Sequence, residues 1–365
     1  MSEWQTFYLK DLGKIVGGTT PSTNNPKNYG NKIAWITPKD LSTLQGRYIK
    51  KGSRSISRLG FKSCSCVLLP KHAILFSSRA PIGYVAIAKK RLCTNQGFKS
   101  IIPNKKIYFE FLYYLLKYHK DNISNIGGGT TFKEVSGATL GLFKVKISPT
   151  YYEQQKIART LSILDQKIEN NHKINELLHT LAYKIYEYYF KYKPKNAKLE
   201  QIIIENPKSS IMVKNAQKTQ DKYPFFTSGD NILFYPKAII DGRNCFLNTG
   251  GNAGIKFYVG KASYSTDTWC ICANEFSDYL YLLLSSIKTH INQSFFQGTS
   301  LKHLQKNLLK KYPIYMPSVH EIKKFNQIIM PLLTLISINT RTSKKLEQIR
   351  DFLLPLLLKQ QVKPQ

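Results

Sequence analysis

The 365-residue chain lacks any apolar run long enough to cross a membrane. The stretch "FLLPLLLK" near the C-terminus is far shorter than the roughly 18 residues that a spanning helix needs. The first residues, "MSEWQTFYLKDLGKIVGG", alternate instead of placing a basic segment before an apolar one, so we expect no secretory leader. With 42% hydrophobic residues the composition is globular, and the length allows two domains. We expect a cytoplasmic protein without a membrane segment.

Cysteine is scarce, with six residues in all. Two Cys-x-Cys pairs occur, Cys64 with Cys66 and Cys270 with Cys272, whereas zinc sites normally use pairs two to four residues apart with further ligands at set distances. Both pairs lie in apolar, strand-like runs, "SCSCVLL" and "WCICA". We therefore expect cysteines that pack as small hydrophobic residues, with no metal and no disulfide.

Acidic residues are few: 22 Asp and Glu face 54 Lys and Arg, which gives a net charge of +32. Residues 1–149 carry 24 basic against 6 acidic side chains, and residues 191–318 carry 17 against 8. Residues 150–190 are neutral, with 5 of each. A general enrichment in lysine is one explanation. We favour a phosphate-binding face on each basic half.

A long segment occurs twice. "SPTYYEQQKIARTLSILDQKIENNHKINELLHTL" begins at Ser148, and "PSVHEIKKFNQIIMPLLTLISINTRTSKKLEQI" begins at Pro317. With an offset of 168 residues, Glu153 aligns with Glu321 and Asn171 with Asn339. Steps of four and three residues predict a helix with one apolar seam in each copy. The seam residues are Ile157, Leu161, Leu164, Ile168, Asn171 and Leu178 in the first copy, and Phe325, Ile329, Leu332, Ile336, Asn339 and Leu346 in the second.

Each predicted helix has about 40 residues and a length of roughly 60 Å. Neither copy can bury its seam alone, so we expect the two helices to pair antiparallel under a pseudo-two-fold axis, as a coiled-coil spacer. The aligned Asn171 and Asn339 would then fix the register. Pro331 falls inside the second copy, and we expect it to kink that helix or to shift its first turn.

The segments outside the repeat predict two globular α+β halves. Short alternating runs between Gly and Pro indicate strands, and "YFEFLYYLLKYHKDNI" and "DYLYLLLSSIKTHINQ" indicate helices. The halves echo each other faintly: "SSRAPIGYVAI" parallels "NTGGNAGIKFYV", and "CTNQGF" parallels "YSTDTW". The predicted boundaries are 1–149 for the first globular domain, 150–193 for the first helix, 194–317 for the second domain and 318–362 for the second helix.

Four segments are distinctive: "GGTTPSTNNPKNYGNKIAWITPKDL", "SSRAPIGYVAIAKKRLCTNQGFKSIIP", "GGGTTFKEVSGATLGLFKVKISPTYYEQQKIARTLSILDQKI" and, in the second half, "YPFFTSGDNILFYPKAIIDGRNCFLNTGGNAGIKFYVGKASYSTDTW". They resemble the specificity (S) subunits of type I restriction-modification systems. The resemblance implies two target-recognition domains, each reading one half of a split double-stranded DNA site. It also implies assembly with two methyltransferase subunits and, for cleavage, two motor-endonuclease subunits. In the second copy of the repeat, Ile322 follows Glu321 where Gln154 follows Glu153 in the first copy.

Catalytic motifs are missing, which agrees with a recognition subunit that needs no cofactor. No Asn/Asp-Pro-Pro-aromatic motif of a methyltransferase and no G-x-x-x-x-G-K-[ST] phosphate loop is present. Two other hypotheses remain: a specificity component of a type IIB-like system, and a stand-alone DNA-acting enzyme. A scaffold that binds only proteins would leave the basic halves unexplained.

Polar loop residues in this basic context are the predicted DNA contacts, because side chains at base edges read sequence while Lys and Arg on phosphates set position. In the first half they are Thr19, Thr20, Ser22, Lys39, Asp40, Ser77, Ser78, Arg79, Asn95, Gln96, Thr130, Thr131 and Lys133. Arg79 suits guanine, and Asn95 or Gln96 suits adenine. The alternative for each Ser, Thr or Asn is a turn residue that bonds its own backbone.

The second half supplies a matching set. Its members are Thr227, Ser228, Asn231, Asp241, Arg243, Asn244, Asn248, Thr249, Asn252, Tyr264, Thr266, Asp267, Thr299, Ser300 and Lys302. Arg243 is the one arginine among 16 lysines between residues 191 and 318, which makes its planar guanidinium the best candidate there to read guanine. The alternative is a salt bridge between Arg243 and Asp241.

Overall fold

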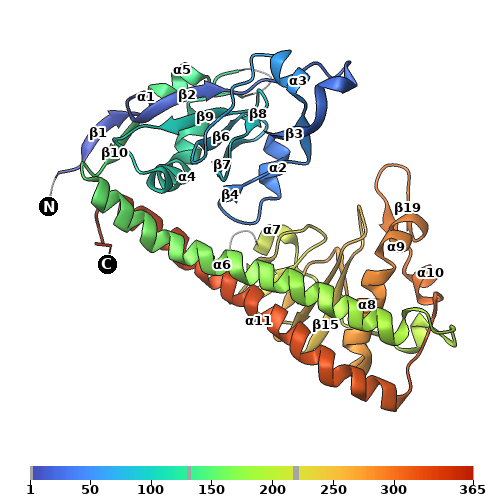
Figure 1. The fold of residues 1–365 in the computed structure, drawn as a ribbon. Helices are drawn as coiled ribbons and strands as arrows, with labels where there is room; N and C mark the ends of the chain where they lie inside the picture. The colour runs from blue at the N-terminus through green and yellow to red at the C-terminus, as the bar shows by residue number, and fades with distance from the viewer. Residues whose placement is uncertain (1–2, 130–132, 217–221, 365) are drawn as a thin grey trace. The chain divides into compact units, whose positions relative to one another are not determined.

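The structure is a computed structural model that describes residues 3–129, 133–216 and 222–364. It divides into two compact units (Figure 1). Unit 1 comprises Met1–Glu169 and Lys345–Gln365, and unit 2 comprises Asn170–Lys344. The division cuts both long helices, so each unit contains part of each helix. It differs from the four predicted segments, which assign whole helices to segments of their own.

Unit 1 is an α+β domain with a five-stranded sheet of order β2-β9-β6-β7-β4 and a three-stranded sheet of order β5-β3-β8. The strands are β1 (Gln5–Tyr8), β2 (Gly13–Gly17), β3 (Tyr29–Ile36), β4 (Tyr48–Ile49), β5 (Arg54–Ile56), β6 (Ile74–Ser78), β7 (Ile82–Ala88), β8 (Cys93–Thr94), β9 (Lys99–Pro103) and β10 (Lys144–Ile147). The helices are α1 (Leu9–Leu12), α2 (Pro38–Ser42), α3 (Arg58–Lys62), α4 (Phe109–Asn125) and α5 (Gly137–Gly141), with a 3-10 turn η1 (Pro26–Asn28).

Helix α4 forms the main core of unit 1. Its apolar side chains, among them Phe111 and Leu115, are buried against Ile74, Phe76 and Ile87 of the large sheet. The first turns of one long helix and the last turns of the other complete this core. The sequence "YFEFLYYLLKYHKDNI" is therefore helical, as predicted, because one face of it covers the sheet.

Unit 2 repeats this plan with a four-stranded sheet β12-β18-β15-β16 and a three-stranded sheet β14-β13-β17. The strands are β11 (Ala197–Lys198), β12 (Ile204–Glu205), β13 (Tyr223–Phe226), β14 (Leu233–Tyr235), β15 (Arg243–Asn248), β16 (Ile255–Val259), β17 (Ser263–Tyr264), β18 (Thr268–Cys272), β19 (Phe296–Gln297), β20 (His303–Leu304) and β21 (Pro313–Ile314). The helices are α7 (Val213–Ala216), α8 (Ser277–Ser286), α9 (Lys288–Ser294) and α10 (Lys306–Lys310), with 3-10 turns η3 (Leu199–Gln201) and η4 (Asn274–Phe276).

The two units share an unusual strand pairing. β8 runs parallel to β3 in unit 1, and β17 runs parallel to β13 in unit 2. Each unit also has a hairpin, β6–β7 or β15–β16, whose first strand pairs with the strand that precedes the domain helix α4 or α8. The faint sequence echo between the halves thus reflects a duplicated fold.

The long helices are α6 (Tyr151–Tyr186), which continues as a π-helical segment η2 (Glu187–Lys191), and α11 (Val319–Leu358). The repeated proline and glutamate mark both starts. The hydroxyl of Thr150 accepts the N–H of Glu153 at 3.4 Å, and the hydroxyl of Ser318 accepts the N–H of Glu321 at 3.4 Å. Both hydroxyls therefore satisfy amide groups that the first helical turn leaves free.

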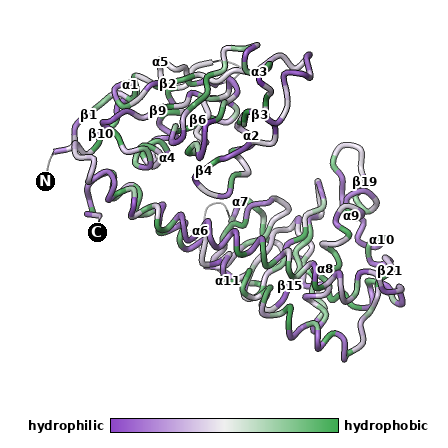
Figure 2. Tube along the Cα trace, in the orientation of Figure 1, coloured by the Kyte–Doolittle hydropathy of each residue, from purple (hydrophilic) through white to green (hydrophobic). Residues whose placement is uncertain are grey.

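Polar residues pair across the two helices in a two-fold pattern. In unit 2, Asn171 Nδ2 donates to Ser343 Oγ at 3.1 Å, and Asn339 Nδ2 donates to Asn175 Oδ1 at 3.0 Å. The repeat aligns Asn171 with Asn339 and Asn175 with Ser343, so one contact is the symmetry counterpart of the other. The helices are therefore antiparallel and pseudo-symmetric, as predicted. Figure 2 shows hydrophobic and hydrophilic residues alternating along both of them.

Burial of the seam is uneven. Ile157 and Leu161 lie in the core of unit 1 beside Leu354 and Leu357, whereas Leu164 and Leu346 are half-buried. Ile168, also in unit 1, is buried. In unit 2 the seam residues Phe325, Ile329 and Ile336 are buried, whereas Leu178 and Leu332 are half-buried. The half-buried seam residues all lie closer to the middle of the helices than Ile157 and Phe325 do.

Pro331 does not shift the first turn of α11. The helix begins at Val319, and its assignment is continuous through Pro331 and Pro355. Pro331 is exposed, so the carbonyl that lacks its usual amide partner has access to water.

Candidate nucleic-acid interface

In unit 1 the predicted loops meet at the ends of the strands. The N–H of Gly18 donates to Phe98 O at 3.2 Å, and the N–H of Thr19 donates to Thr94 O at 3.0 Å. Gly18 is required here, because a Cβ atom at this position would lie 1.9 Å from Asn95 O. The backbone of the loop thus lies directly against the Asn95–Gln96 turn.

Two further loops join the same surface. Ser78 N donates to Gly97 O at 2.8 Å, and Val135 N donates to Ser78 O at 3.0 Å. The side chains of Thr20 and Gln96 are hydrogen-bonded to each other. Residues 18–22, 77–80, 94–98 and 133–135 therefore form one continuous group, which we call the unit 1 loop surface.

The predicted contacts of unit 1 differ in access. Ser22, Lys39, Gln96 and Lys133 are exposed, and Thr19, Thr20, Asp40, Arg79 and Asn95 are half-buried. Thr130 and Thr131 lie outside the described residues.

Three of these predicted contacts face the protein instead. Ser77 and Ser78 are buried; the hydroxyl of Ser77 donates to Pro81 O at 2.8 Å. Asp40 accepts from the hydroxyl of Thr37 at 2.7 Å and from the N–H of Ser53 at 2.7 Å. Burial acts to raise the pKa of Asp40, but these hydrogen bonds lower it overall. Ser77 and Asp40 are therefore engaged within the loops, and the hydroxyl of Ser78 is buried without a hydrogen-bond partner among the described residues.

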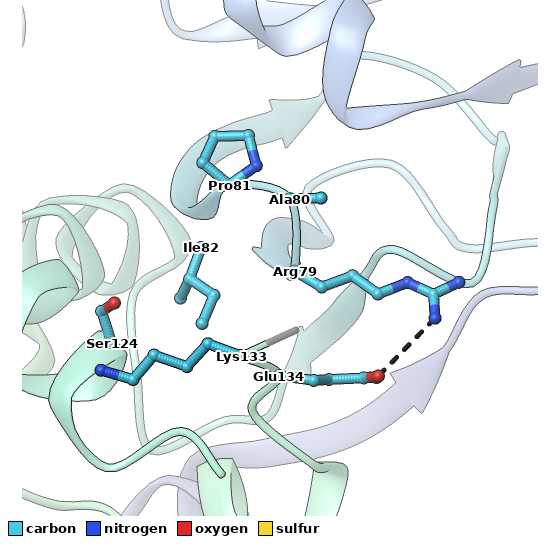
Figure 3. A pocket seen from close by; sticks show the side chains of 7 residues that line it. All are labelled: Arg79, Ala80, Pro81, Ile82, Ser124, Lys133 and Glu134. Atoms are coloured by element: carbon cyan, nitrogen blue, oxygen red, sulfur yellow. Dashed lines mark ion pairs between the residues drawn. The ribbon is translucent and has the colours of Figure 1, made fainter. Parts of the chain in front are cut away.

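Arg79 lines a pocket of about 510 Å³ with Pro81, Ser124, Lys133 and Glu134 (Figure 3). Its guanidinium lies 3.6 Å from the Glu134 carboxylate, to which Lys99 also donates at 3.1 Å. Both Arg79 and Glu134 are more than a third exposed. Because this pairing is weak and open to solvent, Arg79 can exchange Glu134 for another acceptor.

The sequence-based choice omitted a set of exposed cations in unit 1. No acidic residue occurs between Asp40 and Glu110, and the exposed basic residues in this interval include Lys50, Lys51, Arg54, Arg58 and Lys62. Such residues suit phosphate contacts, which set position rather than sequence. The long interval without Asp or Glu was the signal that could have found them.

Unit 2 reproduces two backbone hydrogen bonds of the unit 1 loop surface, those that join Ser78 to Gly97 and to Val135. Thr249 N donates to Asp267 O at 3.2 Å, and Leu304 N donates to Thr249 O at 3.0 Å. Ser265 N donates to Phe226 O at 2.9 Å, as Asn95 N does to Ile36 O in unit 1. These bonds align Asn95 with Ser265 and Gln96 with Thr266, one residue away from the alignment that the sequence echo suggested.

The resulting unit 2 loop surface comprises residues 227–231, 249–252, 265–268 and 299–304. Asn231, Asn252, Thr266, Asp267, Thr299, Ser300 and Lys302 are exposed there, and Ser228 and Thr249 are half-buried.

Four predicted contacts of unit 2 are buried: Thr227, Asn244, Asn248 and Tyr264. Asn248 Oδ1 accepts from the ammonium of Lys256 at 3.2 Å, and Tyr264 donates to Pro207 O. They support the fold of the loops.

Arg243 is engaged within unit 2, and its ion pair is with Asp278 rather than with Asp241. Its guanidinium also donates to Thr334 Oγ1 at 3.0 Å and to Met330 O at 3.1 Å, both on α11. Arg243 begins β15 and Asn248 ends it, so Arg243 lies about 17 Å and Asn244 about 13 Å along the strand from the end at the loop surface, and Asp241 precedes the strand. The prediction that Arg243 reads guanine is corrected accordingly.

Neither a membrane span nor a metal cluster is found within the described ranges. None of the helices there is long and apolar enough to cross a membrane. Likewise, no three His, Cys, Asp or Glu side chains among the described residues are placed to hold a metal ion.

These features define a protein with two similar α+β domains, unlike loop side chains and a pair of antiparallel helices. The family model of the type I restriction-modification DNA specificity domain matches residues 1–180 and 195–348. The specificity subunit of the type I restriction enzyme MjaIX of Methanocaldococcus jannaschii is 32% identical, with 98% of this chain and 93% of that protein covered. The chain therefore belongs to the family of type I restriction-modification specificity subunits.

Two further relatives agree with this assignment. The HindI specificity subunit of Haemophilus influenzae is 31% identical over 46% of this chain and 37% of its own length. The crystal structure of a type I restriction-modification S subunit from M. genitalium has a TM-score of 0.63 and covers 97% of this chain and 96% of that one, at 17% identity. At that identity the likeness supports the fold.

Proposed function

We propose that this chain is the non-catalytic subunit that selects the DNA target of a type I restriction-modification complex in the cytoplasm. Each loop surface reads one half of a bipartite double-stranded site. The observation that carries this proposal is the pair of loop surfaces that share several backbone hydrogen bonds but have different exposed side chains. A shared frame with different side chains is what two different half-sites require.

In unit 1, the proposed readers are Gln96, Asn95 and Arg79, with Thr19, Thr20, Ser22, Lys39 and Lys133 beside them. In unit 2 they are Thr266, Asp267, Asn231 and Asn252, with Ser228, Thr249, Thr299, Ser300 and Lys302. Amide and guanidinium groups can form paired hydrogen bonds with adenine and guanine in the major groove. The exposed Lys and Arg side chains of each unit would hold the phosphates.

The long helices are proposed to set the spacing between the half-sites. Seven residues inserted into α6 between Asp165 and Asn171, and seven into α11 between Ser343 and Arg350, preserve the helical repeat. They add about 10 Å to the pair, or roughly three base pairs of DNA. The methylated motif should gain about three unspecified bases. Unchanged spacing would contradict this role.

The helices are also proposed to bind two methyltransferase subunits, which in turn would join two motor-endonuclease subunits. Apolar side chains are exposed along the unit 2 part of α6, with Leu177 at 71% and Leu181 at 49%. Such a stripe is typical of a protein interface. Leu177→Ser with Leu181→Ser should reduce co-purification of the methyltransferase subunit. Lys173→Ser on the same helix is the control, and equal recovery with all variants would argue against this surface.

A methylome of the native cell, with and without this gene, tests the proposal as a whole. Adenine methylation at one split motif should disappear on deletion and return on complementation. Persistence of every split motif in the deletion strain would contradict the proposal.

A further inference from the structure

Three cysteines of unit 1 meet beneath the loop that begins the unit 1 loop surface. The Sγ atoms of Cys64 and Cys66 are 3.1 Å apart, and Cys93 hydrogen-bonds to Cys66. The hydroxyl of Thr19 lies 3.0 Å from Cys66 Sγ, and the carbonyl oxygen of Thr19 lies 3.6 Å from the same atom. The cysteine pair is thus in contact with a residue that we assign to DNA reading.

A turn, not a strand, brings the pair together, which corrects the sequence-based interpretation. Helix α3 ends at Lys62, and the chain turns through residues 63–65, where Cys64 Sγ donates to Gly60 O at 3.3 Å. The other Cys-x-Cys pair lies in strand β18, where Cys270 is buried against the aromatic residues of a small core. The second pair supplies a natural control, because its backbone is extended.

The chemical setting distinguishes the two thiols. The hydrogen bond from Cys93 outweighs burial and lowers the pKa of Cys66 to about 6. Burial, and then the hydrogen bond with Cys66, raise the pKa of Cys64. Both side chains are half-buried, so a small reagent can reach them. A partly exposed thiolate next to a second thiol is the usual arrangement of a reversible oxidation site.

We propose that Cys64 and Cys66 form a reversible oxidation site for hydrogen peroxide and that their disulfide displaces the Thr19 loop. The Cys66 thiolate attacks one peroxide oxygen, the O–O bond breaks, and the released hydroxide takes up a proton to give water. Cys64 then attacks the Cys66 sulfenic acid, and the S–O bond breaks with release of a second water. Overall, two thiols and one peroxide give one disulfide and two waters, and an external dithiol reverses the change.

The disulfide acts on the loop through Cys66. A disulfide bond is about 2.05 Å long, so the two sulfur atoms must approach from 3.1 Å. Cys66 Sγ then loses its thiolate charge and its contact with the Thr19 hydroxyl. Because Trp35 Nε1 holds the carbonyl oxygen of Thr19 at 3.1 Å, the displacement falls on the side chain and on the residues that follow.

The first test does not depend on DNA. The full chain is treated with stoichiometric hydrogen peroxide, free thiols are alkylated, and peptides are mapped by mass spectrometry. A Cys64–Cys66 disulfide should form and be reversed by dithiothreitol, with faster amide hydrogen exchange at residues 18–22. Cys64→Ser should abolish both changes, and Cys272→Ser should abolish neither. Failure to form this disulfide, or unchanged exchange after it forms, would overturn the proposal.

The second test rests on the proposed function. Oxidation should weaken binding of DNA that contains the half-site of unit 1 by roughly 5- to 150-fold, the equivalent of one lost base contact. Binding to the other half-site should not change, and Cys64→Ser should be insensitive. Equal binding before and after oxidation would overturn the link to DNA reading. Absence of specific binding by the reduced protein would instead contradict the proposed function and leave the disulfide test valid.

Discussion

The two units hold the helix pair by different chemistry at equivalent positions. In unit 1, Asp165 of α6 and Arg350 of α11 form a buried ion pair with a distance of 2.7 Å. The repeat places Leu333 and Ala182 at the corresponding positions in unit 2, where both are buried in the apolar core. At this one pair of equivalent positions, unit 1 therefore has an ion pair and unit 2 has an apolar contact.

The difference extends into the domains. Asp165 also accepts the hydroxyl of Tyr114 at 2.6 Å, and Arg47 lies 3.0 Å from Glu110 and 3.2 Å from Glu169. In unit 2 a different residue, Arg243, connects the domain to α11 by hydrogen bonds to Thr334 and Met330. The two units thus share backbone hydrogen bonds in their loop surfaces, but they use different polar side chains to contact the long helices.

The largest effect is expected from Asp165→Ala. The change leaves Arg350 without its buried partner and Tyr114 without an acceptor, so unit 1 should lose about 3–5 kcal/mol of unfolding free energy. Urea denaturation followed by tyrosine fluorescence measures the loss.

A double variant serves as the control for that prediction. Asp165→Leu with Arg350→Ala copies the apolar pair of unit 2, and it should recover the part of the loss that comes from the unpaired Arg350, whereas Tyr114 still lacks its acceptor. A double variant no more stable than Asp165→Ala would show that the two ends are not interchangeable.

Arg243→Ala should cost unit 2 about 3 kcal/mol, because it leaves Asp278 buried without its cation. Burial already raises the pKa of Asp278 despite the nearby guanidinium. The base preference of the complex should stay unchanged, which DNA selection at low temperature can measure. A relaxed half-site with unaltered stability would restore Arg243 as a reader.

The features that the sequence predicted correctly depend on residues that are close to one another in the chain. The periodicity of the repeat predicted both long helices to within a few residues. Several of the clusters chosen as DNA contacts lie together in the structure, whereas Asp241, Arg243 and Asn244 do not join them. The sequence did not predict the partner of Arg243, because Asp278 lies 35 residues away on another element. The buried Gln154 is a second case in which the sequence did not predict a hydrogen-bond partner. Its side-chain amide donates to Ser148 O at 2.9 Å and to Lys106 O at 3.1 Å, whereas the aligned Ile322 is buried and apolar.

Arg79→Ala should separate reading from stability. Its exposed pairing with Glu134 contributes less than about 1 kcal/mol to folding. Affinity for the unit 1 half-site should nevertheless fall by about 1–3 kcal/mol if Arg79 contacts a base. Titration of the assembled complex with DNA mutated in either half-site measures this change. An equal loss for both half-sites would indicate a phosphate contact instead.

The smallest effect is expected at the helix starts. The hydrogen bond from Lys193, followed by those from Ser318, lowers the pKa of Glu321 to about 2. Because this folded-state pKa lies below the unfolded value, the carboxylate stabilises the fold above pH 4.5 and loses that effect as the pH falls towards 2. Glu321→Gln should cost about 0.5–1 kcal/mol at pH 7 and almost nothing at pH 2. Glu153→Gln is the matched change in the first copy, and a pH-independent cost at Glu321 would exclude the electrostatic explanation.

The central claim is that each unit reads its own half-site. The most direct measurement is the methylome of two strains, one with Gln96→Ala and one with the structurally equivalent Thr266→Ala. The account predicts that each variant relaxes or alters one half of the split motif and leaves the other half unchanged, with a different half affected in each strain. Both halves changing together, or the same half changing in both strains, would contradict it.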